Sequence, residues 1–214
     1  MGNKVIILAA LWIVAGSLLG HGETATKNPQ LAVFVTNGTN APEQILVAAE
    51  GNAGRVLHKA GVDVHWVNCG VEAGARSEPQ CRDIAKSGLV VRMIPRARTF
   101  GDDVFGVSFL DHDAGTYADL FFDPIERLYE QNKDIPLAQI LGEVLAHELG
   151  HLLLGSNAHS RDGIMQPNWT NEQLHCAAMG RMQFSKEQAA KIRTRIASFQ
   201  IEHQILPTLE AANR

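Results

Sequence analysis

Residues 147–169 read HELGHLLLGSNAHSRDGIMQPNW, and this stretch decides the fold. His147 and His151 stand four residues apart, so on an α-helix both side chains lie on one face and can bind a single cation. Glu148 follows the first histidine and is placed to act on a water bound to that cation. These residues predict a zinc-dependent hydrolase.

The residues before this motif have the pattern of a long buried helix. Residues 136–154 (PLAQILGEVLAHELGHLLL) begin with a proline, which suits a first helical turn, and Gly155 follows as a C-terminal glycine. Apolar residues recur between these ends at helical spacing, at Leu137, Ile140, Leu141, Val144, Leu145, Leu149 and Leu152. Both histidines are therefore expected in the last turns of an amphipathic helix. The alternative interpretation is two core histidines, each hydrogen-bonded to the backbone.

The same stretch resembles the metzincin metallopeptidases, whose pattern is H-E-x-x-H-x-x-G-x-x-H followed by a methionine turn. His147, Glu148 and His151 match directly, and residues 163–165 (GIM) look like the methionine turn. Residues 165–169 (MQPNW) resemble a run found in matrix metalloproteinases, and the 18 positions from the first histidine to the methionine equal the interval in that group. The resemblance implies an α+β fold with a twisted mixed sheet, an active-site helix and an irregular C-terminal part.

The third metal ligand is where the sequence departs from the metzincin pattern. The positions of the family's glycine and third histidine are here Leu154 and Asn157, whereas the nearest histidine is His159, eight residues after His151. Asparagine is a poor zinc ligand, because zinc favours an imidazole nitrogen over a neutral amide. We therefore expect His159 to be the third ligand, with Asn157 as an alternative.

A second class of zinc peptidase, the gluzincins, suggests another third ligand. These enzymes use a glutamate from a later helix, and Glu172 stands 21 positions after His151. The segment that resembles a methionine turn and the nearby His159 argue against this arrangement. Glu172 is more simply explained as an acid in the first turn of a helix capped by Thr170 or Asn171.

The metzincin resemblance also implies a role for each residue of the motif. His147, His151 and His159 would bind a zinc ion (Zn2+), and Glu148 would act as the general base toward a zinc-activated water that attacks a peptide bond. Met165 would form an apolar floor beneath the zinc ion and would not bind it. The implied activity is that of a zinc metalloendopeptidase.

Other polar residues have less specific interpretations. Asp162 is expected either to orient a ligand histidine or to cap the turn at Gly163. Glu143, one turn before the motif, is expected to be a solvated helix residue. The remaining histidines lack partners at ligand spacing and are expected to be surface or core residues: His21, His58, His65, His112, His175 and His203.

The amino-terminal segment predicts export from the cytoplasm. Residues 1–22 contain a lysine followed by a mostly apolar run that ends in small residues, which is the pattern of a secretory signal peptide. Residues 23–214 would then form a single metzincin-like catalytic domain, and the protein would be secreted or periplasmic. An uncleaved membrane anchor is the rival interpretation, although the apolar run is short for a membrane span.

Composition and charge limit the range of partners. The chain has 214 residues, of which 45% are hydrophobic, enough for one domain with a proper core. The formal net charge is −4 and no basic run stands out, which argues against nucleic acid as a partner. We expect a peptide or protein substrate, membrane contact only if the signal is uncleaved, and a monomer.

Three cysteines follow the signal segment. In an oxidising compartment Cys69 and Cys81 could form a disulfide across the polar loop between them, although other pairings stay open. Cys176 would then be left over, buried on its helix.

Periodicity predicts the remaining elements. Strands are expected at 31–36, 62–67, 89–94, 104–110 and 116–122, with a hairpin-like turn at 111–115. Helices are expected at 42–60, 123–133 and 186–200, the last opened by a capping box of Ser185 and Gln188. In metzincins an edge strand beside the cleft binds the peptide substrate, and residues 117–122 are the candidate here. The alternative is an ordinary inner strand.

Three functions compete on this basis. The first is a secreted zinc-dependent metallopeptidase. The second is a catalytically silent zincin-like module that binds zinc or a partner, in which the displaced His159 does not complete the site. The third is a membrane-tethered structural protein with an uncleaved signal.

Overall fold

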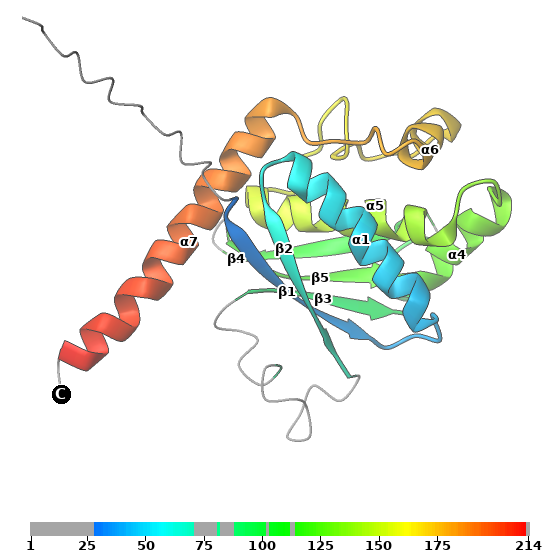
Figure 1. The fold of residues 1–214 in the computed structure, drawn as a ribbon. Helices are drawn as coiled ribbons and strands as arrows, with labels where there is room; N and C mark the ends of the chain where they lie inside the picture. Colours follow the sequence, from blue (N-terminus) through cyan, green and yellow to red (C-terminus); the bar gives the residue numbers. More distant parts are fainter. Residues whose placement is uncertain (1–27, 71–80, 82–87, 102, 112–113, 213–214) are drawn as a thin grey trace, which may run out of the picture.

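The computed structural model describes residues 28–70, 81, 88–101, 103–111 and 114–212, so the expected signal peptide at 1–22 lies outside the described residues. Figure 1 shows the order of the elements along the chain. They are β1 (Gln30–Asn37), α1 (Glu43–Lys59), β2 (Asp63–Cys69), β3 (Leu89–Ile94), β4 (Gly106–Asp111), β5 (Ala114–Phe121), α4 (Phe122–Gln131), α5 (Leu137–Leu154), α6 (Asn171–Ala178) and α7 (Lys186–Ala212).

The strands form one mixed sheet in the order β2-β1-β3-β5-β4. The pairs β1–β2, β1–β3 and β3–β5 are parallel, and β4 runs antiparallel to β5. The predicted α+β architecture is therefore confirmed. Each predicted strand is present, because the apolar alternation that marks a strand is a local property of the sequence.

Of the two interpretations of residues 117–122, the edge strand is wrong and the ordinary inner strand is confirmed. Residues 117–121 belong to β5, which lies inside the sheet between β3 and β4, and Phe122 begins α4. Because β5 pairs in parallel with β3, its hairpin partner β4 is left on the outside. In chain order β5 is the strand nearest to α5, but pairing places β4 at the edge of the sheet.

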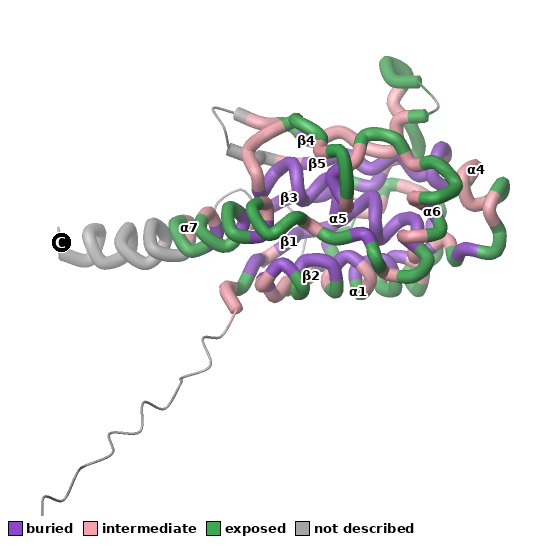
Figure 2. Tube along the Cα trace, turned by 90° about the horizontal axis from the view of Figure 1, so that it is seen from above, coloured by how far each residue is buried: buried purple, intermediate pink, exposed green. Residues whose placement is uncertain are grey.

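The helices α1 and α5 cover one face of the sheet (Figure 1). Alternate residues of β1 (Leu31, Val33 and Val35) point into this core. The two helices are also tied by a hydrogen bond from the Asn52 amide to the carbonyl oxygen of Ala138, at 2.7 Å. Figure 2 shows α5 buried in the interior, with few exposed positions. The helix is thus enclosed on nearly all sides and does not present the solvated face that an amphipathic pattern predicts.

The opposite face of the sheet carries a smaller apolar cluster. Phe34 and Val67 pack there against Cys69 and Cys81. The two cysteines form a disulfide, which confirms the pairing that the sequence suggested. Cys176 on α6 has a free thiol and is half-buried, so it is less enclosed than expected.

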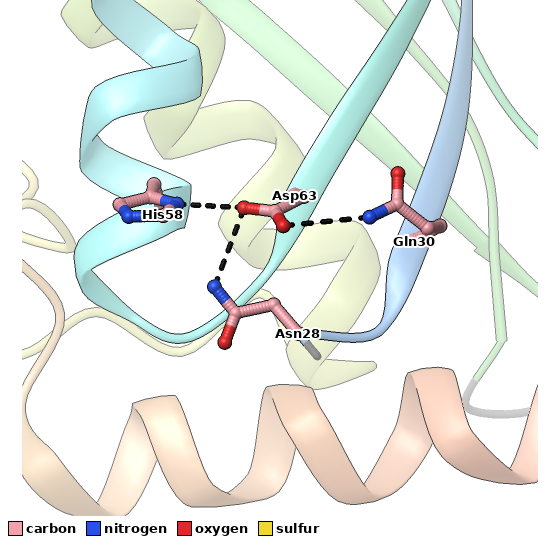
Figure 3. A network of polar contacts seen from close by, with 4 residues as sticks. All are labelled: Asn28, Gln30, His58 and Asp63. Carbon is pink, nitrogen blue, oxygen red and sulfur yellow. Dashed lines mark hydrogen bonds and ion pairs between the residues drawn. The ribbon is translucent and has the colours of Figure 1, made fainter. Parts of the chain in front are cut away.

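A polar network closes the end of α1 against the starts of β1 and β2 (Figure 3). The His58 ring nitrogen Nδ1 lies 2.6 Å from the Asp63 carboxylate, which also accepts hydrogen bonds from Asn28 (3.3 Å) and Gln30 (3.4 Å). These hydrogen bonds lower the pKa of Asp63, and the one from His58 has the largest effect. His58 therefore has a structural partner on the protein surface, as expected for a histidine outside the motif.

The C-terminal part begins where α5 ends. Gly155 ends that helix with a left-handed backbone (φ 62°), which costs glycine little. A long irregular segment then leads to α6, whose N-terminus is a capping box of Thr170 and Gln173. The predicted capping box of Ser185 and Gln188 opens α7. None of the described helices is long and apolar enough to span a membrane.

Candidate metal centre

Three imidazoles converge at the end of α5. His147 and His151 lie on consecutive turns of the helix, and His159 comes from the segment after the Gly155 turn. One ring nitrogen from each lies within 4.8 Å of the others. The His159 ring centroid is 5.4 Å from that of His147 and 4.9 Å from that of His151. The structure therefore brings together the three residues that the sequence singled out.

Backbone carbonyl oxygens orient the two helical imidazoles. His147 Nδ1 lies 2.7 Å from the carbonyl oxygen of Ile164, and His151 Nδ1 lies 2.8 Å from that of Ser156. A carbonyl oxygen can only accept a hydrogen bond, so each Nδ1 carries the proton and each Nε2 keeps its lone pair. The acceptors are backbone groups and not the Asp162 carboxylate, which was one of the two roles expected for that residue.

The two unprotonated nitrogens face each other. His147 Nε2 and His151 Nε2 are 3.0 Å apart. Two lone pairs at this distance repel each other unless a cation lies between them. Two nitrogens bound tetrahedrally to zinc at 2.0–2.1 Å would be about 3.3 Å apart, close to this spacing. The donor set therefore fits a zinc ion.

Burial keeps the helical imidazoles neutral. It lowers the pKa of His147 to about 4 and also lowers the pKa of His151. Both side chains are buried, so near neutral pH they are in the uncharged form that binds metal. His159 is exposed and closes the group from the solvent side.

Glu148 lies beside these histidines and is held by β4. The residue is 5% exposed, and burial raises the pKa of its carboxyl to about 7. The Ser108 hydroxyl lies 2.7 Å from Glu148 Oε2. A Cβ on Gly106 would lie 2.7 Å from Glu148 Cγ and Oε1, so only glycine leaves this carboxyl its place. A carboxyl with a pKa near 7 is suited to exchange protons at neutral pH.

A cleft of about 340 Å³ opens over the histidines and Glu148. It lies between β4, α5 and the segment before α6. Its apolar wall includes Val144, Phe105 and Trp169, the rings of the last two being 6.4 Å apart. Within the described residues β4 pairs only with β5, so its outer edge borders the cleft. The cleft could receive an extended chain along a strand edge.

Met165 is buried beneath α5. A Cβ added to Gly150 would lie only 2.4 Å from the Met165 sulfur, which shows how closely the two segments pack. The backbone of this segment is fixed by hydrogen bonds from Ser160 N to the Met165 carbonyl and from Ile164 N to the Gln183 carbonyl. The sulfur thus lies next to the turn that carries His151. Its role as an apolar floor stays a prediction.

Comparison with known proteins rests on structure alone, since no protein-family model and no curated protein sequence matches this chain. Archaemetzincin from Methanopyrus kandleri is similar over 81% of this chain and 99% of its own, with 15% identity and a TM-score of 0.48. Metalloproteinase-II from Bacteroides fragilis is similar over 81% of this chain and 55% of its own, with 12% identity and a TM-score of 0.51. The fold of this chain is therefore similar to that of the Bacteroides fragilis metalloproteinase. The chain spans about half the length of the Bacteroides fragilis protein.

The two alternative ligands, Asn157 and Glu172, lie in different places. Asn157 is exposed and lines the same cleft as the histidines. Glu172 is exposed in the first turn of α6, behind the Thr170 cap, and is not among the residues that line the cleft. The structure therefore supports the helix-terminus interpretation of Glu172.

Two features of the site were not predicted from the sequence. Glu143 was expected to be solvated, but it is fully buried, and burial raises its pKa to about 7. Gln139 donates hydrogen bonds both to Glu143 and to the Ala177 carbonyl of α6, so the fold covers this face of α5. The contact between Ser108 and Glu148 was also missed. The only sign of this contact in the sequence is that Ser108 is a polar residue in an apolar strand. Glu148, the partner of Ser108, lies 40 residues away.

Proposed function

We propose that this protein is a zinc metallopeptidase of the metzincin type. His147, His151 and His159 hold the zinc ion, and Glu148 is the general base. The observation that carries this proposal is the convergence of three imidazole nitrogens within 4.8 Å, beside a buried carboxyl in an open cleft. Neutral nitrogen donors and an accessible face are what a catalytic zinc site requires.

The protein groups divide the proposed reaction between them. Zinc, when bound, supplies Lewis acidity and lowers the pKa of water to about 7. Glu148 takes the proton of the attacking water and returns it to the leaving amine. The outer edge of β4 pairs with an extended substrate and holds the scissile carbonyl beside the histidines. Substrates are therefore peptides or proteins in an extended conformation.

We propose further that the protein acts outside the cytoplasm, as a monomer. The disulfide between Cys69 and Cys81 supports an oxidising compartment. The signal-like pattern of residues 1–22 supports export. Amino-terminal sequencing of the exported protein and its mass in solution test these two points.

The test of the proposed activity compares the wild type with Glu148→Gln, both loaded with zinc. We expect the wild type to cleave a peptide library and the variant to lose at least about a hundredfold in kcat, the usual weight of a general base. Both proteins should bind one zinc ion. A zinc-loaded wild type that cleaves no peptide would favour the silent-module alternative.

The ligand assignment has its own test. We expect His159→Ala to weaken zinc binding strongly, because it removes an imidazole donor. Asn157→Ala, at a neighbouring exposed position of the same cleft, and Glu172→Ala on α6 should change it little. Competition with a zinc chelator measures the three affinities. A larger loss from Asn157→Ala or Glu172→Ala than from His159→Ala would overturn the assignment.

A further inference from the structure

Ser108 is a buried polar residue at the edge of the sheet, directed at α5. The residue is 6% exposed. Its hydroxyl oxygen lies 2.7 Å from Glu148 Oε2 and 2.9 Å from the Glu148 backbone carbonyl oxygen. Both possible acceptors thus belong to the same residue of the active-site helix.

The backbone contact alone would explain a structural serine, since the carbonyl oxygen satisfies a buried hydroxyl. The neighbouring residue shows that the side-chain contact also matters. Gly106 stands two positions earlier and so on the same side of β4, and a Cβ there would overlap the Glu148 side chain at 2.7 Å. Two positions of β4 are therefore shaped around this one carboxyl.

A glutamate side chain has three rotatable bonds, and its carboxyl can take many positions unless it is held. A hydrogen bond to a charged group is stronger than one between neutral groups. The Ser108 hydroxyl comes from a strand that is paired along its length with β5, so it is a fixed donor. It can therefore select one orientation of the carboxyl relative to the histidines.

We propose that Ser108 is a positioning residue for Glu148: its hydroxyl holds the carboxyl in the orientation that proton transfer requires. This inference rests on the proposed peptidase function. Ser108 acts through Glu148, and Gly106 provides the space in which the carboxyl is held.

The kinetic test uses Ser108→Ala and Ser108→Thr in the zinc-loaded protein. Ser108→Ala should lower kcat about tenfold with little change in KM, because the lost hydrogen bond is one to a charged group. Ser108→Thr retains the hydroxyl and should recover most of the loss. The matched control is Ser198→Ala on α7, which removes a serine bond to the Thr194 carbonyl and should leave kcat unchanged. An unchanged kcat in Ser108→Ala would overturn the inference.

A second readout needs no activity. The stability of the zinc-free protein is measured for the wild type, Ser108→Ala, Glu148→Ala and the double variant. We expect Ser108→Ala to destabilise the wild type more than it destabilises Glu148→Ala, because only the backbone contact remains in the second background. Equal effects would show that the side chains are not coupled and would overturn the inference. Coupling in a wild type that has no peptidase activity would instead reject the proposed function, and with it a role for Ser108 in catalysis.

Discussion

Single residues in this protein differ from their expected state because the fold buries them. His147 and His151 are neutral donors because burial disfavours the imidazolium and backbone carbonyls hold Nδ1–H. Burial acts in the same way on an acid at Glu143, a carboxyl with no solvent exposure on a helix enclosed by other elements. Its charged form is disfavoured, so it couples stability to pH.

Glu143→Gln should flatten the pH dependence of stability. Below about pH 4 this carboxyl is protonated in both states. As pH rises, the unfolded chain ionises near 4.5, whereas the folded protein keeps the proton until about pH 7. The stability contributed by the raised pKa is therefore lost over this interval, about 3 kcal/mol in all.

Denaturant unfolding of the zinc-free protein at pH 5 and pH 8 measures this effect. The wild type should lose more stability than Glu143→Gln between the two values, while Glu126→Gln on the exposed side of α4 should behave as the wild type. If the wild type and Glu143→Gln lost the same stability between pH 5 and pH 8, the result would contradict a raised pKa at Glu143. Glu148 and Glu50, whose pKa values are also raised by burial, account for part of the remaining slope.

At the scale of elements, the site is made where β4 approaches α5. The helix supplies two histidines and Glu148, and the strand supplies the surface that receives the carboxyl. Gly106 allows this approach because it has no side chain. The strand therefore determines both the edge of the cleft and the place of the Glu148 carboxyl.

Gly106→Ala should displace the Glu148 carboxyl without removing the metal site. The new Cβ would lie 2.7–2.8 Å from the Glu148 side chain, which must move. We expect kcat to fall by at least about tenfold, since displacement of a general base by about 1 Å is costly, while zinc affinity stays near that of the wild type. Steady-state kinetics and chelator competition measure the two quantities. An unchanged kcat would mean that catalysis does not depend on this position of the Glu148 carboxyl.

At the scale of the whole molecule, a metal bound by the three histidines would link two parts of the chain. The histidines come from α5 and from the irregular segment after it, so zinc would join the sheet-and-helix core to the C-terminal part. A ligand that binds only the folded state stabilises it by mass action. Metal removal should therefore lower the stability of the entire protein.

Zinc at a hundred times its Kd should raise the free energy of unfolding by about 2.7 kcal/mol. For a chain of this size that corresponds to a rise in Tm of about 5–10 °C. A chelator should reverse the shift, and His159→Ala should reduce it strongly. Thermal unfolding by circular dichroism is the measurement, and the same Tm with zinc and with chelator would argue against binding at this site.

The Cys69–Cys81 disulfide is a second constraint on the whole chain. Its sequence separation of 12 residues predicts a loss of about 3 kcal/mol when it is removed by Cys69→Ser with Cys81→Ser. Cys176→Ser, which removes a free thiol, is the control and should change stability little. Denaturant midpoints for the two proteins check this. A loss from the control as large as that from the double variant would contradict the expectation.

The sequence by itself determined the local features of this protein. These features are the end of α5 at Gly155, the start of α7 at Ser185, the strand positions and the i, i+4 histidine pair. Each depends on residues a few positions apart, and such local spacing is visible along a chain. The sequence also indicated His159 as the third imidazole, because the family's ligand position holds Asn157 and His159 is the nearest histidine after the helix. The donor chemistry of the site could therefore be predicted before its geometry was known.

Only the tertiary structure decided which strand borders the cleft, why Glu143 is buried, and what holds Glu148. Strand order follows from pairing between distant segments, so β4 and not β5 is at the edge. Burial depends on what other elements cover, and the Ser108 contact joins residues 40 apart. These properties arise from long-range packing, and a linear pattern carries no measure of distance in space.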